Sequence, residues 1–428
     1  MERNEGETMN VDIVVIGGGA SGLAAALSAK DDYNSVLVLE REHVLGGILN
    51  QCIHNGFGLH VFREELTGPE YASRFIEKFN EQKIDYKLDT TVLSINKPED
   101  TFIIEAYNTD DGPLMIQAKA VILSSGCYER TRGQIKLPGA RVAGIMPAGS
   151  AQRYLNIDGY LVGKDVFILG SGDIGLIMAR RMTLEGAKVH GVAELMPYSN
   201  GLTRNIVQCL HDFDIPLYLS HTVTDIKGDK RLEEITIQEV DKDYQPIPGT
   251  EKKFNVDTLL LSVGLVPDTM VFESLDLDLS PITNGAVVDH TYQSNIPGIF
   301  ACGNALHVHD LVDWVTIESE KAGASAKRYV AGEIKDKRQL LPINPLDGIR
   351  YTVPQFIDMN NYKDSVTVMF RVTNKHDLGT FTVKQGDTVI QQKKARFIAP
   401  AEMESLMIKP DQLIDHETPI TIELEVRE

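Results

Sequence analysis

Two glycine clusters with the same internal spacing carry the clearest chemical signal in this chain. The clusters read G-x-G-x-x-G and consist of Gly17, Gly19 and Gly22, and of Gly170, Gly172 and Gly175. Between a strand and a helix, the first glycine permits a tight turn and the second lets a pyrophosphate approach the backbone. The third lets the helix pack closely on the strand. The spacing therefore predicts two dinucleotide sites.

The segments around each cluster supply the elements that such a turn needs. An apolar run typical of a buried parallel strand precedes each cluster (residues 11–16 and 164–169), and a helical stretch follows it (20–30 and 174–185). A second apolar run then ends in an acid, Glu40 in one copy and Glu194 in the other, which can accept hydrogen bonds from an adenosine ribose. Glycine turns in an ordinary α/β protein are the alternative interpretation.

The internal repeat continues after both acids. Each half next contains two strand-like runs around a polar turn, within residues 101–120 and 231–256. A buried run follows and ends in glycine, Gly126 in the first half and Gly264 in the second. The pattern predicts an α/β fold with two Rossmann-like dinucleotide-binding domains.

Composition excludes several classes of protein. The 428 residues carry a net charge of −19, which argues against nucleic acid or an anionic membrane surface as a partner. The four cysteines lie far apart without a C-x-x-C, so neither a disulfide framework nor a zinc site is indicated. No apolar stretch is long enough for a membrane span, and residues 1–10 are unlike a signal peptide, so we expect a cytoplasmic protein.

Further short motifs extend the pattern beyond the two turns. They are Gly46 and Gly47, the strand ends at Gly126 and Gly264, and the segment I-F-A-C-G-N that ends in Gly303 and Asn304. Together with both glycine clusters, they make residues 11 to about 330 resemble the flavoproteins with two dinucleotide-binding domains, which include thioredoxin and glutathione reductases. The resemblance implies FAD at the first cluster, NAD(H) at the second and a glutathione reductase-like fold. The family usually has Asp in place of Asn304, whose amide oxygen can still accept a hydrogen bond from the ribityl chain.

Other segments point to a subgroup. They are NQCIHNGFG (residues 50–58), LTGPE (66–70), GCYERTRG (126–133) and HVHDLV (307–312). These resemble the flavoprotein that accompanies anaerobic glycerol-3-phosphate dehydrogenases and, more distantly, the FAD subunits of opine dehydrogenases and hydrogen cyanide synthase. The resemblance implies an electron-transferring subunit beside a substrate dehydrogenase, in a homo- or hetero-oligomer.

The resemblance does not extend to a redox-active disulfide. Reductases of the glutathione type carry two cysteines after the G-G pair, where this chain has Leu49 and His54, and the C-x-x-C of thioredoxin reductases is absent. Electrons must therefore pass from the flavin directly to an acceptor or partner. Cys52 and His54 are candidate catalytic residues, because an imidazole near a thiol can stabilise a thiolate. Alternatively, Cys52 packs as a small hydrophobe and His54 contacts flavin or backbone.

Two histidines directly follow the second FAD motif. His307 and His309 precede a helix expected to begin near Asp310 or Asp313, and in family members the N-terminus of this helix points at the flavin. Both histidines are candidates to supply a proton there, or they are polar residues in a turn. The His-x-His-Asp pattern lacks a further ligand cluster, so we predict no metal site.

Charged side chains near the expected cofactors bear on ligand choice. Glu194 would accept from the 2′-hydroxyl of NADH and repel the 2′-phosphate of NADPH, and the next basic residue is Arg204. NADH is therefore favoured. Arg130 and Arg132 either hold a phosphate or carboxylate or lie in a surface loop.

The chain is expected to contain three domains. We assign residues 1–155 and 280–335 to a FAD-binding domain, 156–279 to an NAD-binding domain, 336–348 to a linker and 349–428 to an all-β domain. Strand-like runs at 366–372, 381–383, 389–393 and 420–426 predict a small β-sandwich. A docking or assembly role and an inert cap are both open for it.

These features favour a FAD-dependent NAD(H):acceptor oxidoreductase that exchanges electrons with a partner dehydrogenase, in glycerol 3-phosphate metabolism. One alternative is a FAD/NAD-type subunit of an amino-acid, opine or amine dehydrogenase, whose own substrate lies near His54 and His309. The other is a noncatalytic FAD-bound assembly subunit.

Overall fold

The computed structural model describes residues 8–334 and 337–426. Most of the segment inspected for a signal peptide, and residue 336 of the expected linker, lie outside these ranges. The chain divides into two compact units. The first runs up to Cys127 and resumes at Pro267, and the second comprises Tyr128–Val266.

The first unit is built on a sheet with strand order β5-β2-β1-β8-β7-β6, in which β19 also pairs with β8. The parallel strands β1, β2 and β19 are almost continuously apolar because both faces are covered, and β6 and β7 form an antiparallel extension of β8. The strands are β1 (Met9–Ile16), β2 (Val36–Leu39), β5 (Asp85–Lys87), β6 (Thr90–Asn96), β7 (Phe102–Asn108), β8 (Gly112–Leu123) and β19 (Ile299–Ala301), with a small hairpin of β3 (Asn55–Phe57) and β4 (Leu66–Thr67).

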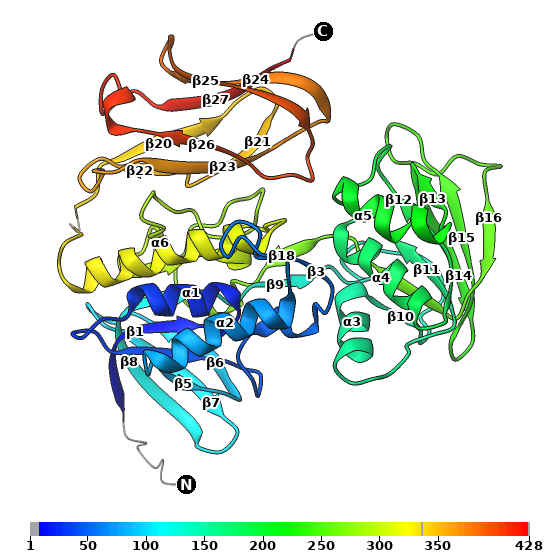
Figure 1. Cartoon of the computed structure of the whole chain (residues 1–428), viewed down its shortest axis with the longest axis horizontal. Coiled ribbons are helices and arrows are strands. Elements are labelled where there is room, and N and C mark those ends of the chain that lie inside the picture. The colour runs from blue at the N-terminus through cyan, green and yellow to red at the C-terminus, as the bar shows by residue number, and fades with distance from the viewer. Residues whose placement is uncertain (1–7, 335–336, 427–428) are drawn as a thin grey trace. The chain divides into compact units, whose positions relative to one another are not determined.

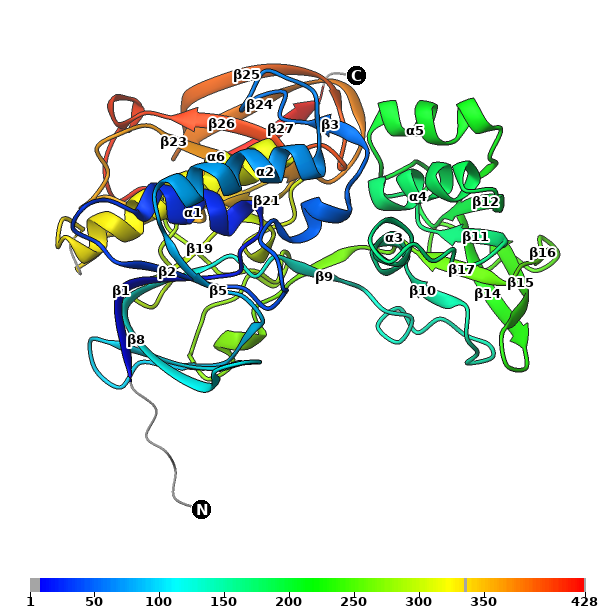
Figure 2. The same cartoon turned by 60° about the horizontal axis from the view of Figure 1, so that its bottom comes forward.

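Three helices cover one side of this sheet, as both views show (Figures 1 and 2): α1 (Ala20–Ala29), α2 (Gly68–Glu81) and α6 (Val312–Val330). Helix α2 begins with a capping box between Thr67 and Glu70. Helices α1 and α6 pack closely, since a Cβ built on Gly323 would lie 2.1 Å from the carbonyl oxygen of Ala25. Among the described residues, no helix combines the length and apolar character that a membrane span requires.

The second unit repeats the plan with a parallel sheet of order β10-β17-β11-β12-β13. Helices lie on one face of this sheet and an antiparallel β14-β15-β16 sheet lies on the other (Figure 2). The elements are β10 (Ile145–Pro147), α3 (Ala148–Asn156), β11 (Asp165–Leu169), α4 (Asp173–Leu184), β12 (Lys188–Glu194), α5 (Thr203–Cys209), β13 (Leu217–Leu219), β14 (His221–Gly228), β15 (Leu232–Glu239), β16 (Lys252–Asn255) and β17 (Thr258–Leu261), with β9 (Cys127–Glu129) and β18 (Leu265–Pro267) at the ends of the unit.

Residues 340–426, here called the C-terminal domain, form two sheets around their own apolar core. One has the order β22-β20-β27-β24-β25 and the other β21-β23-β26. The strands are β20 (Leu340–Pro345), β21 (Ile349–Val353), β22 (Phe356–Asp358), β23 (Val366–Val372), β24 (His376–Gln385), β25 (Thr388–Ile398), β26 (Glu404–Ile408) and β27 (Ile420–Val426). The predicted α/β fold with two Rossmann-like domains and added C-terminal β-structure is confirmed.

The domain limits differ from those expected from the sequence. Residues 340–345 are not a linker but strand β20, which pairs with β22 and β27 and buries Leu341 and Ile343. The second unit starts at Tyr128 instead of residue 156, because β10 pairs with β17 and α3 packs on α4. It ends at Val266 instead of residue 279.

Candidate functional site

The first glycine turn joins β1 to α1. Gly17 has φ +105°, and a Cβ there would lie 2.5 Å from Ser124 O. A Cβ on Gly22 would lie 1.8 Å from Gly17 O, so this glycine lets the helix pack on the strand. At Gly19, by contrast, the nearest atom to a Cβ is Gly47 Cα at 3.8 Å. The turn is therefore closed at its two ends and open at its middle glycine.

The second glycine turn, between β11 and α4, has the same construction. A Cβ on Gly170 would lie 2.0 Å from Ser262 O, and one on Gly175 would lie 2.6 Å from Gly170 O. The middle glycine, Gly172, is again less confined, since only Ser262 Oγ approaches within 3.3 Å. Both turns thus leave free the position at which a pyrophosphate approaches in such folds.

The two acids predicted to follow these turns occupy equivalent positions. Glu40 is buried and its Oε2 accepts a hydrogen bond from Gly18 N at 2.6 Å, while its Oε1 accepts from Glu42 N. In the second copy, Glu194 Oε2 accepts from Ser171 N at 2.9 Å and its Oε1 accepts from Met196 N at 3.0 Å. In both copies the carboxylate therefore braces the glycine turn from the end of the next strand.

The pair Gly46 and Gly47 lies against the first turn. Gly46 N donates to Gly18 O at 2.9 Å, and both glycines have positive φ. A Cβ on Gly47 would lie 2.9 Å from Gly19 Cα, so a side chain would fill the space beside the middle glycine. Gly126 at the end of β8 also has positive φ, with nothing within 4 Å of a Cβ. Gly19 and Gly47 thus border one open backbone surface, and the backbone at Gly126 is also open.

Asn304 anchors the loop that follows β19. Its Oδ1 accepts from His309 N at 2.9 Å, and its Nδ2 lies 3.6 Å from Cys127 Sγ. The preceding Gly303 has φ +63° and donates its N–H to Glu318 Oε1 at 2.7 Å. The side chain and backbone of the G-N motif are therefore already engaged with the histidine segment and with helix α6.

Glu318 brings both predicted histidines together. His307 Nε2 lies 2.8 Å from Glu318 Oε2, and His309 Nε2 lies 3.2 Å from Glu318 Oε1. All three side chains are at most 1% exposed. Burial lowers the pKa of His307, and the neighbouring His309 lowers it further. Burial opposes ionisation of Glu318, but the two imidazoles outweigh it and hold its pKa at about 2.

The same three side chains have the types and spacing of metal ligands, with ligand atoms within 4.8 Å of one another. A cation would take the lone pairs of the histidine nitrogens, and ligating histidines almost always donate their other N–H to an acceptor. Among the described residues, neither His307 Nδ1 nor His309 Nδ1 has a hydrogen-bond partner. If both histidines donate their Nε2–H groups to the Glu318 carboxylate, the short distances among the three side chains are explained without a cation.

Glu318→Gln is expected to lower the melting temperature at pH 7, with a smaller loss in acid. A carboxyl whose folded pKa lies below its ordinary value adds stability that is complete above that value and disappears as pH falls toward the folded pKa. The difference between 4.5 and about 2 corresponds to about 3 kcal/mol. Thermal unfolding of both proteins at pH 7 and pH 3 measures the effect. An equal difference at the two pH values would contradict the assignment.

Asp313 in the first turn of α6 holds the segment after the β3 strand. Its carboxylate accepts hydrogen bonds from the backbone N–H groups of Gly58, His60 and Val61 at 3.1, 3.2 and 2.8 Å. The ring of Trp314 also stacks on that of His60, with centroids 5.0 Å apart. Sequence reasoning assigned no role to Asp313 or Glu318, and the presence of three acids in the first half of α6 was the available signal.

Cys52 and His54 lie between the G-G pair and this segment. Burial raises the pKa of the Cys52 thiol to about 12, which disfavours the thiolate that covalent chemistry requires. The ring of His54 lies 5.0 Å from that of Phe57, and its Nδ1 lies 3.0 Å from Asn55 O. A catalytic role for either residue stays a prediction.

The arginines after Gly126 belong to the second unit. The guanidinium of Arg132 donates to the carbonyl oxygens of Leu137, Pro138, Gly139 and Ala140, so it organises its own loop. The backbone of Arg130 donates to Gly264 O at 2.9 Å. Gly264 has φ +103°, and a Cβ there would meet nothing closer than the Arg130 side chain at 3.8 Å. The hydrogen bonds of the Arg132 guanidinium thus stabilise the conformation of the loop that follows it.

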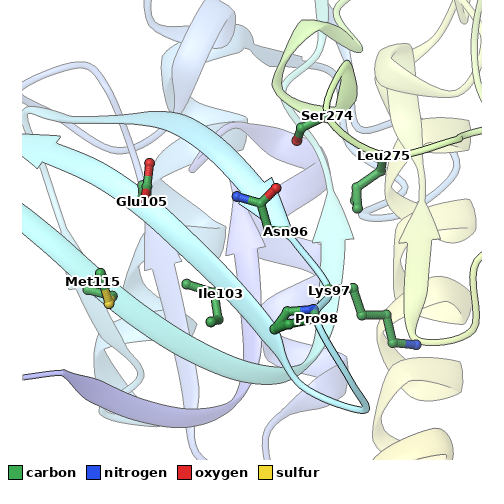
Figure 3. A pocket seen from close by; sticks show the side chains of 8 residues that line it. All are labelled: Asn96, Lys97, Pro98, Ile103, Glu105, Met115, Ser274 and Leu275. Carbon is green, nitrogen blue, oxygen red and sulfur yellow. The ribbon is translucent and has the colours of Figure 1, made fainter.

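A surface hollow of about 510 Å³ lies on the antiparallel part of the first unit (Figure 3). Its lining is half polar and half apolar and includes Asn96, Glu105, Met115 and Leu275. The glycine turn of this unit contacts Ser124, directly after Leu123 at the C-terminal end of β8. Met115 lies eight residues before Leu123, which is roughly 26 Å along a strand. The hollow is therefore separate from the glycine turn of this unit and contains none of the predicted site residues.

Comparison with protein families identifies one that covers most of the chain. The model of the pyridine nucleotide-disulphide oxidoreductase family matches residues 11–322. This range includes both glycine turns, both bracing acids, the G-N motif and the histidine pair.

Among curated proteins, the chain is similar to the HcnB component of hydrogen cyanide synthase from Pseudomonas protegens, with 23% identity over 78% of this chain and 72% of HcnB. It is 27% identical to an alkyl hydroperoxide reductase component from Staphylococcus epidermidis, over 74% of this chain. The match spans only 57% of that second relative.

Solved structures give the same fold. Thioredoxin reductase from T. acidophilum superposes with a TM-score of 0.61 at 24% identity, covering 76% of this chain and 99% of that one. L-proline dehydrogenase from P. horikoshii gives a TM-score of 0.53 at 19% identity, covering 74% of this chain and 55% of that one. At these identities the comparison establishes the fold.

Proposed function

The chain belongs to the pyridine nucleotide-disulphide oxidoreductase family, a family of flavin-dependent enzymes that use FAD and NAD(P), and on this basis we propose that it is an NADH:acceptor oxidoreductase serving a partner dehydrogenase. The observation that carries the proposal is the duplicated glycine turn. In both copies the middle glycine is open and a buried acid braces the turn, which supports one dinucleotide site at each turn.

The residues of the first unit fit FAD. Gly19 and Gly47 would line the pyrophosphate, and the open backbone at Gly126 would face the cofactor. Glu40 would receive the adenosine ribose, and the segment from Gly303 to Asn304 would contact the ribityl chain. FAD and NADH supply the hydride chemistry when bound, while the protein supplies placement and electrostatics.

The buried histidines would hold a proton near the flavin. His307 and His309 each present one nitrogen to Glu318 and leave the Nδ1 atom without a partner among the described residues. An imidazole fixed by a carboxylate through one nitrogen can accept or release a proton at the other. Glu318 would therefore act by orienting the histidines, with Cys52 and His54 as further candidates beside the flavin.

This chain has neither a C-x-x-C nor the cysteine pair of glutathione-type reductases, so electrons would pass from the flavin directly to an acceptor or a partner protein. The segments at residues 50–58 and 126–133 support a glycerol-3-phosphate dehydrogenase subunit as that partner. The similarity to a component of hydrogen cyanide synthase favours one second candidate, in which this chain is the FAD/NAD-type subunit of a dehydrogenase for an amino acid, opine or amine.

An anaerobic titration of the FAD-loaded chain distinguishes the candidates. Stoichiometric loss of flavin absorbance on addition of NADH alone is the expected result. Loss with an amino acid, opine or amine but not with NADH would favour the second candidate. Loss with glycerol 3-phosphate alone would make this chain itself the dehydrogenase. No loss with any of them would favour an assembly subunit.

NADH is expected to reduce the flavin with a kcat/KM at least tenfold above that of NADPH. Glu194 is 4% exposed and would lie where the adenosine ribose binds, so its charge would repel a 2′-phosphate. Steady-state kinetics with both nucleotides measure the ratio. Glu194→Gln removes the charge and keeps the size, so the ratio should narrow in this variant. An unchanged ratio would show that Glu194 does not select the nucleotide.

A further inference from the structure

One side chain of the C-terminal domain reaches the segment that carries the histidines. Arg371 lies on β23, and its Nη2 donates to Val308 O at 3.1 Å. Its Nη1 donates to Pro400 O at 3.1 Å and to Ala401 O. The guanidinium therefore joins the backbone of residues 307–310, here called the histidine loop, to two points of its own domain.

Asp310 makes the reciprocal connection. Its Oδ2 accepts a hydrogen bond from Met403 N of the C-terminal domain at 3.1 Å, and its Oδ1 lies 3.8 Å from Arg371 Nη2. The side chains of Arg371 and Asp310 are only 13% and 9% exposed. The hydrogen bond from Met403 N therefore ties Asp310 to the C-terminal domain, and the 3.8 Å ion pair with Arg371 adds an attraction that is screened less than one at the surface.

Packing supports the same connection. Tyr351 and Val353 of β21 pack in the apolar core that also contains residues of β1, α1 and α6, and not in the separate core of the C-terminal domain. The ring of Tyr351 also contacts that of His307 edge-on, with centroids 6.1 Å apart. Further along, Lys321 Nζ of α6 donates to Thr367 Oγ1 of β23 at 3.1 Å, and the strands of the C-terminal domain face α6 in Figure 1. The histidine loop thus lies between Glu318 of α6 on one side and Tyr351 and Arg371 of the C-terminal domain on the other.

We infer that Arg371 is a positioning residue of the flavin site, through which the C-terminal domain fixes the histidine loop and the G-N motif before it. The inference rests on the proposed FAD site in the first unit. Arg371 acts on the loop backbone at Val308, which lies between the two histidines and next to the His309 N–H that donates to Asn304. The C-terminal domain would therefore be part of the redox site and not an inert cap.

The test compares Arg371→Met with Lys384→Met in the full-length protein. Lys384 pairs with Glu423 inside the C-terminal sheet, so its loss perturbs that domain without touching the histidine loop. Arg371→Lys keeps the charge but cannot reproduce the planar fork, and should fall between Arg371→Met and the wild type. Three quantities are measured for each protein: amide hydrogen exchange of residues 303–312, the dissociation constant of FAD, and the midpoint potential of the bound flavin.

Arg371→Met is expected to speed exchange in residues 303–312 and to weaken FAD binding about tenfold. We also expect about a tenfold change in the ratio of affinities for reduced and oxidised flavin, which is about 30 mV for a two-electron couple. Lys384→Met should leave all three near the wild-type values. A change in melting temperature alone, with potential and FAD affinity unchanged, would overturn the inference.

Hydrogen exchange of the protein without FAD separates this inference from the proposed function. If the wild type bound no FAD, the proposed function would fail, while faster loop exchange in Arg371→Met would still demonstrate the connection. If FAD bound normally and exchange of residues 303–312 did not change, the inference would fail alone. If Arg371→Met does not fold, Arg371→Lys and Asp310→Asn are compared with the wild type by the same three measurements. Wild-type values for both variants would overturn the inference.

Discussion

Gly19→Val is expected to abolish FAD binding while the chain stays folded. Gly19 has φ −78° and ψ −168°, an extended conformation that valine adopts readily. Its Cβ would meet only Gly47 Cα, at 3.8 Å, so the added Cβ creates no clash within the protein. The branched side chain would instead occupy the open surface between the glycine turn and the G-G pair, where the pyrophosphate must approach the backbone.

Loss of that approach should weaken FAD binding at least a hundredfold, or about 2.7 kcal/mol. The measurement is quenching of flavin fluorescence on titration of the refolded or apo protein, with circular dichroism to verify folding. Gly133→Val is the matched control, because Gly133 lacks a positive φ and a Cβ there meets only Thr131 Oγ1 at 3.8 Å. A Gly19→Val protein that binds FAD within threefold of the wild type would refute the assignment of this turn.

Gly172→Val is expected to produce the reciprocal loss, with FAD retained and reduction by NADH slowed at least a hundredfold. Gly172 has φ −65° and ψ 163°, which valine also tolerates. A Cβ would contact Ser262 Oγ at 3.3 Å, a hydroxyl that can rotate slightly, so the second unit should fold. The added methyl groups would block the backbone that a nicotinamide dinucleotide must approach.

Stopped-flow reduction of the FAD-loaded variant by NADH measures this effect, and reduction by dithionite verifies that the flavin remains reducible. The same Gly133→Val protein serves as the control. The two variants together form a stringent test because the turns are built alike. If Gly172→Val lost FAD, or if Gly19→Val lost only NADH reduction, the assignment of cofactors to turns would be reversed.

Local patterns allowed much of the fold to be predicted. Strands β23 and β27 have the expected limits, residues 366–372 and 420–426, and the two strand-like runs expected within residues 101–120 form β7 and β8 around a polar turn. Residues 340–345 were misassigned because Pro342 and Pro345 suggested a linker. Strand pairing there depends on β22 and β27, the latter about 80 residues away in sequence, so no local signal could identify it.

The site could be predicted only in part for the same reason. The glycine turns and their acids are local in sequence, and each motif has a fixed spacing that the backbone of a strand-turn-helix requires. The cluster around Glu318 has no such signature. Its members lie on a loop and a helix, and their charges and hydrogen bonds are defined only once α6 packs against α1 and beside the loop.

Residue type and short spacing were enough to predict the two glycine turns between strand and helix and the acids Glu40 and Glu194 that follow them. Three-dimensional packing was needed to show that Glu318 joins the histidines, that Asp313 holds residues 58–61, and that Arg371 reaches the histidine loop. These contacts join residues up to 255 positions apart. Burial and long-range packing create them, and neither is encoded in any short segment of the chain.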